Sequence, residues 1–207
     1  MAWGRWVLVT FALLLLPAAA PERGLAQPDD SPAGQNLTGQ LLIATPDMRD
    51  PRFDHAVILI VRHNKGGAFG IVVNRPVARE KLARLLEDLG QSTKGIDGSI
   101  DIYAGGPVEP DIGFVLHDAA YHRPETVAIG EALAMTSSPA VLRDIAQHHG
   151  PAKFIFAFGY AGWGPGQLED ELAQHAWFTA PADPQLLFDD APARLWQDAI
   201  ARRSRAL

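Results

Sequence analysis

One segment constrains the fold of this chain more than any other, because an apolar run leads directly into a cluster of glycines. Residues 153–158 read KFIFAF, four glycines follow between residues 159 and 166 around Trp163, and the acidic run QLEDELAQ comes next. Glycine is favoured where φ is positive or where another group approaches the backbone closely. The order predicts a central strand, a loop over residues 159–166 and a helix over residues 166–176.

Such a loop admits two interpretations. Free backbone N–H groups at a helix start can hold an anion or a polar ligand, but a tight turn closed by Trp163 has the same sequence. The run lacks the Gly-Lys-Ser/Thr of a phosphate-binding P-loop, and its glycines do not have the dinucleotide-binding spacing. Glu169 in the first helical turn already complements the helix dipole. The rigid turn is therefore the favoured interpretation.

Shorter patterns predict the remaining elements. Apolar and β-branched runs indicate strands, whereas leucines at helical spacing, early prolines and terminal glycines indicate helices. The predicted strands cover residues 40–44, 55–63, 68–74, 99–104, 112–117 and 126–130, and the other predicted helices cover residues 77–90, 137–150 and 191–204. Hairpins come early and helices lie between later strands, which predicts an α+β fold.

The N-terminus has the pattern of a secretory signal peptide. Arg5 precedes the apolar run WVLVTFALLLL, and small residues end at Ala26. Residues 1–26 are therefore predicted to be a signal peptide, 27–36 a polar disordered linker and 37–207 a single domain. This organisation predicts export to the periplasm without a stable membrane span after cleavage; an uncleaved anchor or a misassigned start of a cytoplasmic protein is the alternative.

Charge and composition exclude several function classes. The chain has 18 basic and 24 acidic residues, a formal net charge of −6, and no cysteine. An acidic domain is repelled by phosphate backbones, so no nucleic-acid partner is expected. Without cysteine there is no disulfide, thiolate metal site or cysteine nucleophile. Glu171 and His175 share a helix face but lack a third ligand, so no metal or cofactor is expected and a surface pair is the favoured interpretation.

A second glycine segment, residues 105–109, also follows a predicted strand. If the two segments meet in space, we expect them to line one cleft. Glu109 and Glu169 would then form a carboxylate pair for acid–base chemistry or for a divalent cation; alternatively, each carboxylate caps its own loop. The candidate ligand-binding residues are Gly105, Gly106, Pro107, Glu109, Gly159, Trp163, Gly164, Gln167 and Glu169.

Three further side chains lie at predicted strand ends. Asn74 and Arg75 offer an amide and a guanidinium to a carboxylate or phosphate, although an exposed or ion-paired arginine is the common case. His117 ends a strand, where sites are often built. We keep all three as secondary candidates.

Several ordered motifs resemble one known family. GQLLIATPDMRDPRFDHAVILI, HNKGGAFGIVVNRP, YAGGPVEPDIGFVLH, GYAGWGPGQLEDE and HAWFTAPAD together span roughly residues 37–200, and they resemble the YqgE/AlgH family. The resemblance implies a bent, bifurcated mixed β-sheet forming a pseudo-barrel with helices packed outside. Members are described as transcriptional regulators without an agreed activity. Where members carry Asp-Arg-Gly-Phe, this chain has Ile112 in place of the arginine.

The function expected from these observations is a non-catalytic ligand-binding or regulatory module for an unidentified small ligand or protein partner. No complete catalytic set occurs, which favours a role other than catalysis. The alternative is a hydrolase using Glu109, Glu169 or His117. A DNA-binding regulator fits less well, since the chain is acidic and lacks a basic recognition helix.

Overall fold

The computed structural model describes residues 36–189 and 191–203. The predicted signal peptide, and the predicted linker apart from residue 36, lie outside the described residues. Within the described ranges, no helix is long and apolar enough to cross a membrane.

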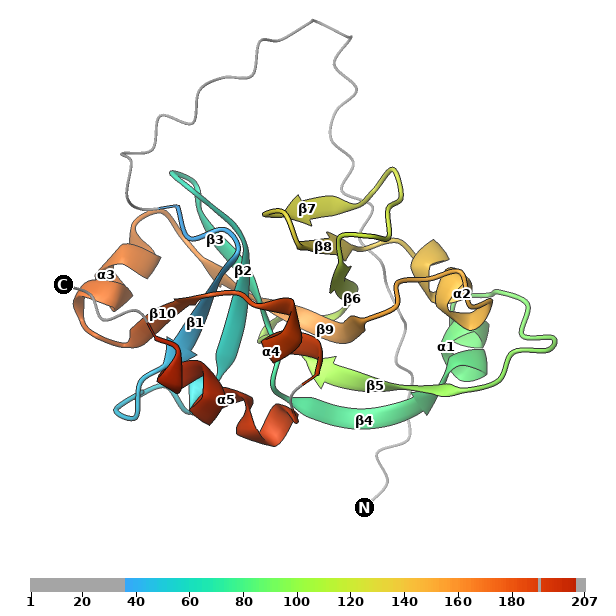
Figure 1. Cartoon of the computed structure of the whole chain (residues 1–207), viewed down its shortest axis with the longest axis horizontal. Coiled ribbons are helices and arrows are strands. Elements are labelled where there is room, and N and C mark those ends of the chain that lie inside the picture. Colours follow the sequence, from blue (N-terminus) through green and yellow to red (C-terminus); the bar gives the residue numbers. More distant parts are fainter. Residues whose placement is uncertain (1–35, 190, 204–207) are drawn as a thin grey trace, which may run out of the picture.

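One large sheet divides into two arms (Figure 1). Its main path runs β10-β1-β2-β3-β9-β6-β8-β7, and a ribbon of β4 and β5 joins the same central strand, β9. The strands are β1 (Gln40–Ala44), β2 (Val57–Asn64), β3 (Gly67–Val72), β4 (Pro76–Lys81), β5 (Ser99–Ala104), β6 (Val108–Asp118), β7 (Val127–Ile129), β8 (Leu133–Thr136), β9 (Phe154–Trp163) and β10 (Trp177–Pro181).

Strand β9 belongs to both arms of the sheet. Its first half pairs with β6 and, in parallel, with β5, whereas Ala161–Trp163 pair with β3. The sheet forks near Gly159, whose φ is +73°. This arrangement confirms the bent, bifurcated sheet and the α+β class that were expected.

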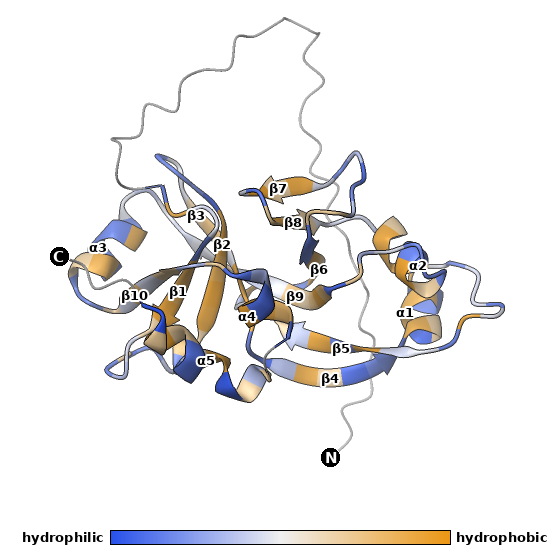
Figure 2. Cartoon of the chain, viewed as in Figure 1, coloured by the Kyte–Doolittle hydropathy of each residue, from blue (hydrophilic) through white to orange (hydrophobic). Residues whose placement is uncertain are grey.

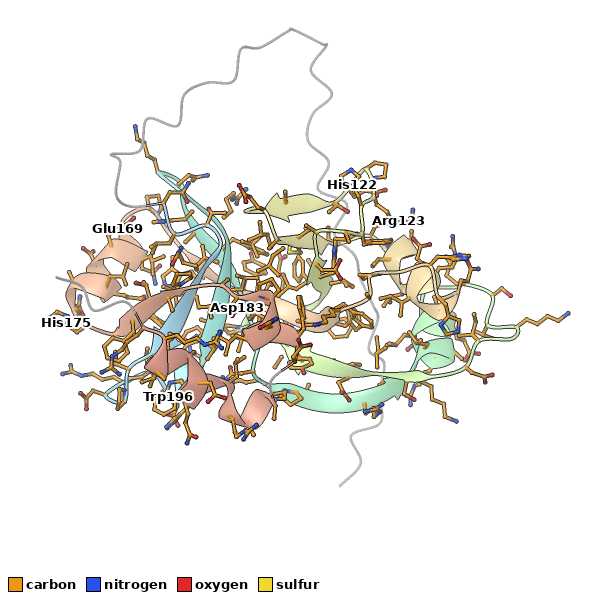
Figure 3. The ribbon with its side chains drawn as sticks, viewed as in Figure 1. His122, Arg123, Glu169, His175, Asp183 and Trp196 are labelled. Carbon is orange, nitrogen blue, oxygen red and sulfur yellow. The ribbon has the colours of Figure 1, made fainter. Side chains whose placement is uncertain are left out.

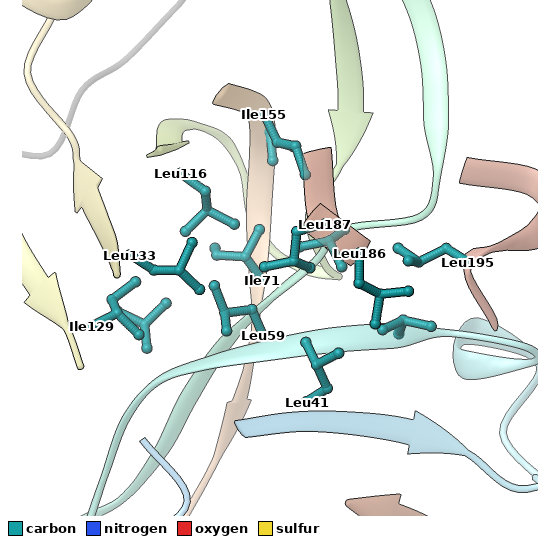
Figure 4. Close-up of a cluster of buried hydrophobic side chains, with 14 of the residues drawn as sticks. Leu41, Leu59, Ile71, Leu116, Ile129, Leu133, Ile155, Leu186, Leu187 and Leu195 are labelled. Atoms are coloured by element: carbon teal, nitrogen blue, oxygen red, sulfur yellow. The ribbon is translucent and has the colours of Figure 1, made fainter. Parts of the chain in front are cut away.

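Short helices cover the sheet. They are η1 (Pro51–Phe53), α1 (Leu82–Asp88), α2 (Ala140–Ala146), α3 (Gln167–Ala173), α4 (Pro184–Phe188) and α5 (Pro192–Ala201). The largest core cluster lies between the sheet and helices α4 and α5, with Leu59, Ile71 and Leu186 among its members (Figure 4). Separate clusters lie under α1 and α2 and under α3. Strands β1 and β2 are largely apolar, and so is β7 at the end of the sheet (Figure 2).

The central glycines serve close backbone packing more than loop formation. A Cβ on Gly106 would lie 2.0 Å from the carbonyl carbon of Tyr160, and one on Gly105 would lie 2.3 Å from the carbonyl oxygen of Gly159. The predicted loop over residues 159–166 is therefore wrong in its first half, because β9 continues to Trp163. Only residues 164–166 form the turn before α3.

Other differences from the predicted elements have simple causes. Residues 77–81 of the predicted helix belong to β4, which pairs with β5, and only the leucine-rich part is helical. Strands β8 and β10 and helix α4 were missed, and β6 begins four residues earlier than predicted. Tertiary pairing decides these short segments, since their own patterns are too brief to specify a state.

Candidate functional site

A cleft opens where β9 ends and α3 begins. Its volume is about 1030 Å³, and its walls come from the segment after β1, the start of β6, the end of β9, and α3 with the start of β10. The lining residues are Asp47, Met48, Arg49, Asp50, Arg52, Phe53, Pro107, Val108, Gly162, Trp163, Gln167, Glu171, Gln174, His175, Ala176 and Trp177.

The floor of the cleft is built around one carboxylate. Glu171 Oε2 accepts hydrogen bonds from the indole N–H groups of Trp163 and Trp177, both at 2.8 Å, and Oε1 accepts one from the Gln167 amide at 2.9 Å. The two indoles pack edge to face with centroids 6.2 Å apart and are only 6% and 4% exposed. Charge-assisted bonds of this kind are strong, so Glu171 locks α3 against β9 and β10.

One wall of the cleft is pinned from outside by Asn74 and Arg75. The Asn74 side chain accepts from the backbone N–H of Val57 and donates to the carbonyl of His55. Arg75 donates to the carbonyls of Arg52 and Asp54. Both candidates therefore hold the 52–57 segment in place, which accounts for an amide and a guanidinium at this strand end.

Four polar side chains of the lining have no partner within residues 36–189 and 191–203. Asp50 and Arg52 form an ion pair at 2.7 Å, and Gln167 and Glu171 bond each other. By contrast, no hydrogen bond or ion pair ties Asp47, Arg49, Gln174 or His175 through its side chain to another described residue. The cleft therefore offers a guanidinium, an imidazole, an amide and a carboxylate to whatever enters it.

The two predicted glycine segments do meet in space. The N–H of Gly105 donates to the carbonyl of Phe158 at 2.7 Å, and its own carbonyl accepts from Val72 at 2.8 Å. Pro107 follows this contact and lines the cleft together with Trp163 and Gln167. Gly105, Gly106 and Gly159 support the cleft from behind as backbone packing. Gly164 donates its N–H to the Gln167 side chain and so closes the turn before α3.

The expected pair of Glu109 and Glu169 does not form part of this cleft. Glu169 accepts a hydrogen bond from His63, with Nε2 and Oε1 2.9 Å apart. His63 Nδ1 accepts from the backbone N–H of Leu37, which places the ring proton on Nε2. Glu109 lies in an irregular stretch of β6 with φ +46°. Burial raises the pKa of Tyr160, and the negative charge of Glu109 adds to that rise.

His117 lies deep in the other arm of the sheet. It is 0% exposed, its Nδ1–H donates to the carbonyl of Asp118 at 2.7 Å, and its Nε2 accepts from the hydroxyl of Thr136 at 2.9 Å. Burial lowers its pKa and outweighs the bond to the Asp118 carbonyl. Val108 and His117 pair with Tyr160 and Phe154 of β9, which are six residues apart, so at about 3.3 Å per residue His117 is on the order of 20 Å from the cleft end of β6. The hydrolase set of Glu109, Glu169 and His117 is therefore not one site.

Several residues of the cleft were not predicted as site residues. Residues 47–53 are charged and irregular, and they reach the cleft because β10 pairs with β1. Glu171 and His175 were interpreted as a surface pair, but Glu171 faces the two indoles. The signal available in the sequence was the pair of tryptophans flanking α3. Across residues 36–189 and 191–203, no group of three His, Asp or Glu side chains is arranged to hold a metal.

Comparisons with known proteins agree with the fold. A UPF0301 protein of Thioalkalivibrio sulfidiphilus is 43% identical over 170 residues, 82% of this chain and 91% of that protein. One from Thiobacillus denitrificans is 47% identical over 158 residues, 76% of this chain and 84% of that protein. The solution structure of the AlgH protein from Pseudomonas aeruginosa matches with a TM-score of 0.69 and 44% identity, covering 83% of this chain and 91% of that one.

A more distant structure shares the fold alone. The crystal structure of a protein from Corynebacterium diphtheriae matches with a TM-score of 0.65 at 22% identity, covering 87% of this chain and 92% of that one. The model of the AlgH-like family DUF179 matches residues 41–206. The chain therefore belongs to the AlgH-like family of UPF0301 proteins.

Proposed function

We propose that this protein is a non-catalytic binding module whose cleft between the 47–53 segment and α3 receives a ligand. The observation that carries the proposal is the contrast between a fixed floor and free rim groups. Glu171 immobilises the two indoles, while Asp47, Arg49, Gln174 and His175 remain available. Binding sites combine a preorganised apolar base with a few placed polar groups in this way.

The segments that resemble the family converge on this place. The first motif supplies residues 47–53, the second supplies Asn74 and Arg75, and the third supplies Pro107 and Val108. The last two supply the tryptophans, Glu171 and His175. If these motifs served only to build the hydrophobic core, they would not be expected to meet around one cleft.

The lining favours binding over catalysis. The one carboxylate at the floor is saturated by three donors, so it is poorly placed to act as a base. No nucleophile and base lie together in the cleft lining. A ligand that is held without being transformed fits this arrangement.

The proposal is tested by NMR titration of the ¹⁵N-labelled full chain with a library of small organic fragments and tetrapeptides. Ligands in the cleft should shift the indole N–H signals of Trp163 and Trp177 but not that of Trp196, which donates to the carbonyl of Ala44 outside the cleft lining. Gln174→Trp should fill the cleft and abolish the shifts, whereas Ala173→Trp, one residue away and outside the lining, should not. A library without hits at the cleft, or hits that survive in Gln174→Trp, would contradict the proposal.

Export to the periplasm is a separate part of the proposal, and it rests on the sequence of residues 1–26 alone. Fractionation of the native host and N-terminal sequencing should give a mature chain beginning at Gln27. A cytoplasmic protein that retains its first residues would contradict this part and leave the cleft proposal standing.

A further inference from the structure

Three of the polar side chains in the cleft lining that have no partner among the described residues, Arg49, Gln174 and His175, can donate hydrogen bonds. The guanidinium of Arg49 forms no ion pair with any residue that the structure describes, although neighbouring Arg52 is paired with Asp50. Gln174 and His175 line the cleft from the end of α3, and neither side chain has a partner among the described residues. Asp47 is the one free group that only accepts. Such a set suits a ligand that carries a negatively charged acceptor for Arg49 together with peptide-like donors and acceptors for the other groups.

His175 is held in a backbone conformation that disfavours its side chain. Its φ is +58° at the residue that follows the C-terminal turn of α3, and its N–H donates to the carbonyl of Leu172. Glycine is the usual residue at such a helix end, because a Cβ is disfavoured there. Non-glycine residues in strained conformations are enriched at binding sites. His148 adopts φ +59° just past α2 but lies outside the cleft lining, so it provides a matched comparison.

Apolar groups lie beside these donors. Met48 and Phe53 are half-buried on the wall that carries Arg49. Val108, at the start of β6, is 36% exposed and is one of the few large apolar side chains in the described part of the chain with so much exposed surface. The volume of about 1030 Å³ is at the upper limit of small-molecule pockets. A chain segment with an apolar side chain uses this width better than a small metabolite does.

We propose that the cleft binds an extended peptide segment in which a carboxylate, from an Asp or Glu side chain or a chain terminus, lies next to a large apolar residue. Arg49 and His175 receive the carboxylate from the two walls, Gln174 bonds a peptide carbonyl, and Asp47 accepts peptide N–H groups. The apolar side chain contacts Phe53 and Val108. This inference rests on the proposed binding function and adds the chemistry of the ligand.

Four probes test this ligand chemistry on the full chain. The first two are the peptides Ac-Gly-Phe-Asp-Gly-NH₂ and Ac-Gly-Phe-Asn-Gly-NH₂, which differ only in charge, and the third is Ac-Gly-Ala-Asp-Gly-NH₂, which lacks the aromatic ring. Phenylacetate is the fourth and represents a free small carboxylate. The Phe–Asp peptide should bind at least about tenfold more tightly than either other peptide, since a charge-assisted hydrogen bond and a buried ring each contribute that much. It should also bind more tightly than phenylacetate.

Variants then assign the contacts. Arg49→Gln and His175→Gly should each weaken binding of the Phe–Asp peptide about tenfold or more. Arg62→Gln, which removes an exposed arginine on β2 outside the cleft lining, and His148→Gly should leave it unchanged. His175→Gly relieves backbone strain, so weaker binding cannot be attributed to an unfolded protein.

The outcomes separate this inference from the proposed function. If the Asp and Asn peptides bind equally and Gln174→Trp blocks both, the carboxylate inference is wrong and the binding cleft survives. If phenylacetate binds as tightly as the peptide, the site is for small acids and the peptide inference is wrong. If His175→Gly binds as well as the wild type, His175 is only a helix end. If none of the four probes binds, the carboxylate-peptide inference is wrong, and the proposed function is decided by its own titration.

Discussion

Glu171 and His117 each organise a polar network inside an apolar surrounding, but the two networks lie in different arms of the sheet. Glu171 joins α3 to β9 and β10 through three side-chain donors. His117 joins β6 to β8 through Thr136, whose hydroxyl continues to Thr126 at 2.8 Å. Figure 3 shows the separation, with Glu169 and His175 near one end of the molecule and Arg123, beyond Thr126, toward the other.

The difference lies in what surrounds each network. Around His117 the ring N–H and the Thr136 hydroxyl both have acceptors, and Arg123, Tyr121 and Asp144 bond one another outside them at 2.6–2.8 Å. Around Glu171 the floor is satisfied but the rim is not. A polar network whose groups bond one another, such as the one around His117, helps to specify the fold. A cleft that combines the bonded Glu171 with polar side chains lacking partners among the described residues is suited to binding a ligand.

Replacing Glu171, the centre of the network at the floor of the cleft, should have the largest effect on stability. Glu171→Leu leaves two nearly buried indole N–H groups without an acceptor, and each unsatisfied group costs about 1–3 kcal/mol. We expect a loss of about 2–4 kcal/mol in the free energy of unfolding, measured by urea denaturation. Glu171→Gln keeps an acceptor and should lose less. If both variants are as stable as the wild type, the carboxylate does not organise the floor.

Lowering the pH should reduce the free energy of unfolding through the other network, the one around His117. Because the pKa of His117 is lowered in the folded protein, the unfolded chain takes up a proton first as the pH falls below about 6.5. The stability that depends on neutral His117 is therefore fully present above that pH. Below it, the free energy of unfolding falls by up to about 1.4 kcal/mol per pH unit from this group. Denaturation curves between pH 7.5 and 5 measure the slope. His117→Gln, which cannot titrate, should flatten it, and an unchanged slope would assign the acid sensitivity to other groups.

The smallest effect is expected at the two histidine helix ends. His148→Gly and His175→Gly each remove a Cβ from a residue at positive φ, and each should raise stability by about 0.5–1 kcal/mol. Thermal unfolding measures both. Equal gains would show that the two ends are structurally equivalent, so that any difference in binding between the variants belongs to the cleft. A loss at His175→Gly would instead reveal a contact that stabilises the fold.

The sequence predicted the strands with continuous apolar runs and the importance of residues 159–172, because burial on both faces and clustered glycines leave strong local patterns. It misassigned residues 77–81, since VAREK suits a helix by itself and becomes a strand only beside Ser99–Ala104. The wall of the cleft was missed for a related reason. Arg49 and His175 are about 125 residues apart in the chain, and only the pairing of β1 with β10 brings their segments together.

The position of β9 also sets an order for assembly. This strand pairs with β3, β5 and β6, which all precede it in the chain, and one of these pairings is parallel. During synthesis neither arm of the sheet can be completed until residue 163 has left the ribosome. Until then, roughly the first three-quarters of the polypeptide has apolar strand edges that are still unpaired. Late, long-range pairing of this kind makes folding slow and aggregation a hazard. Chains truncated before β9 should therefore depend on chaperones and be degraded rather than accumulate as a half-sheet.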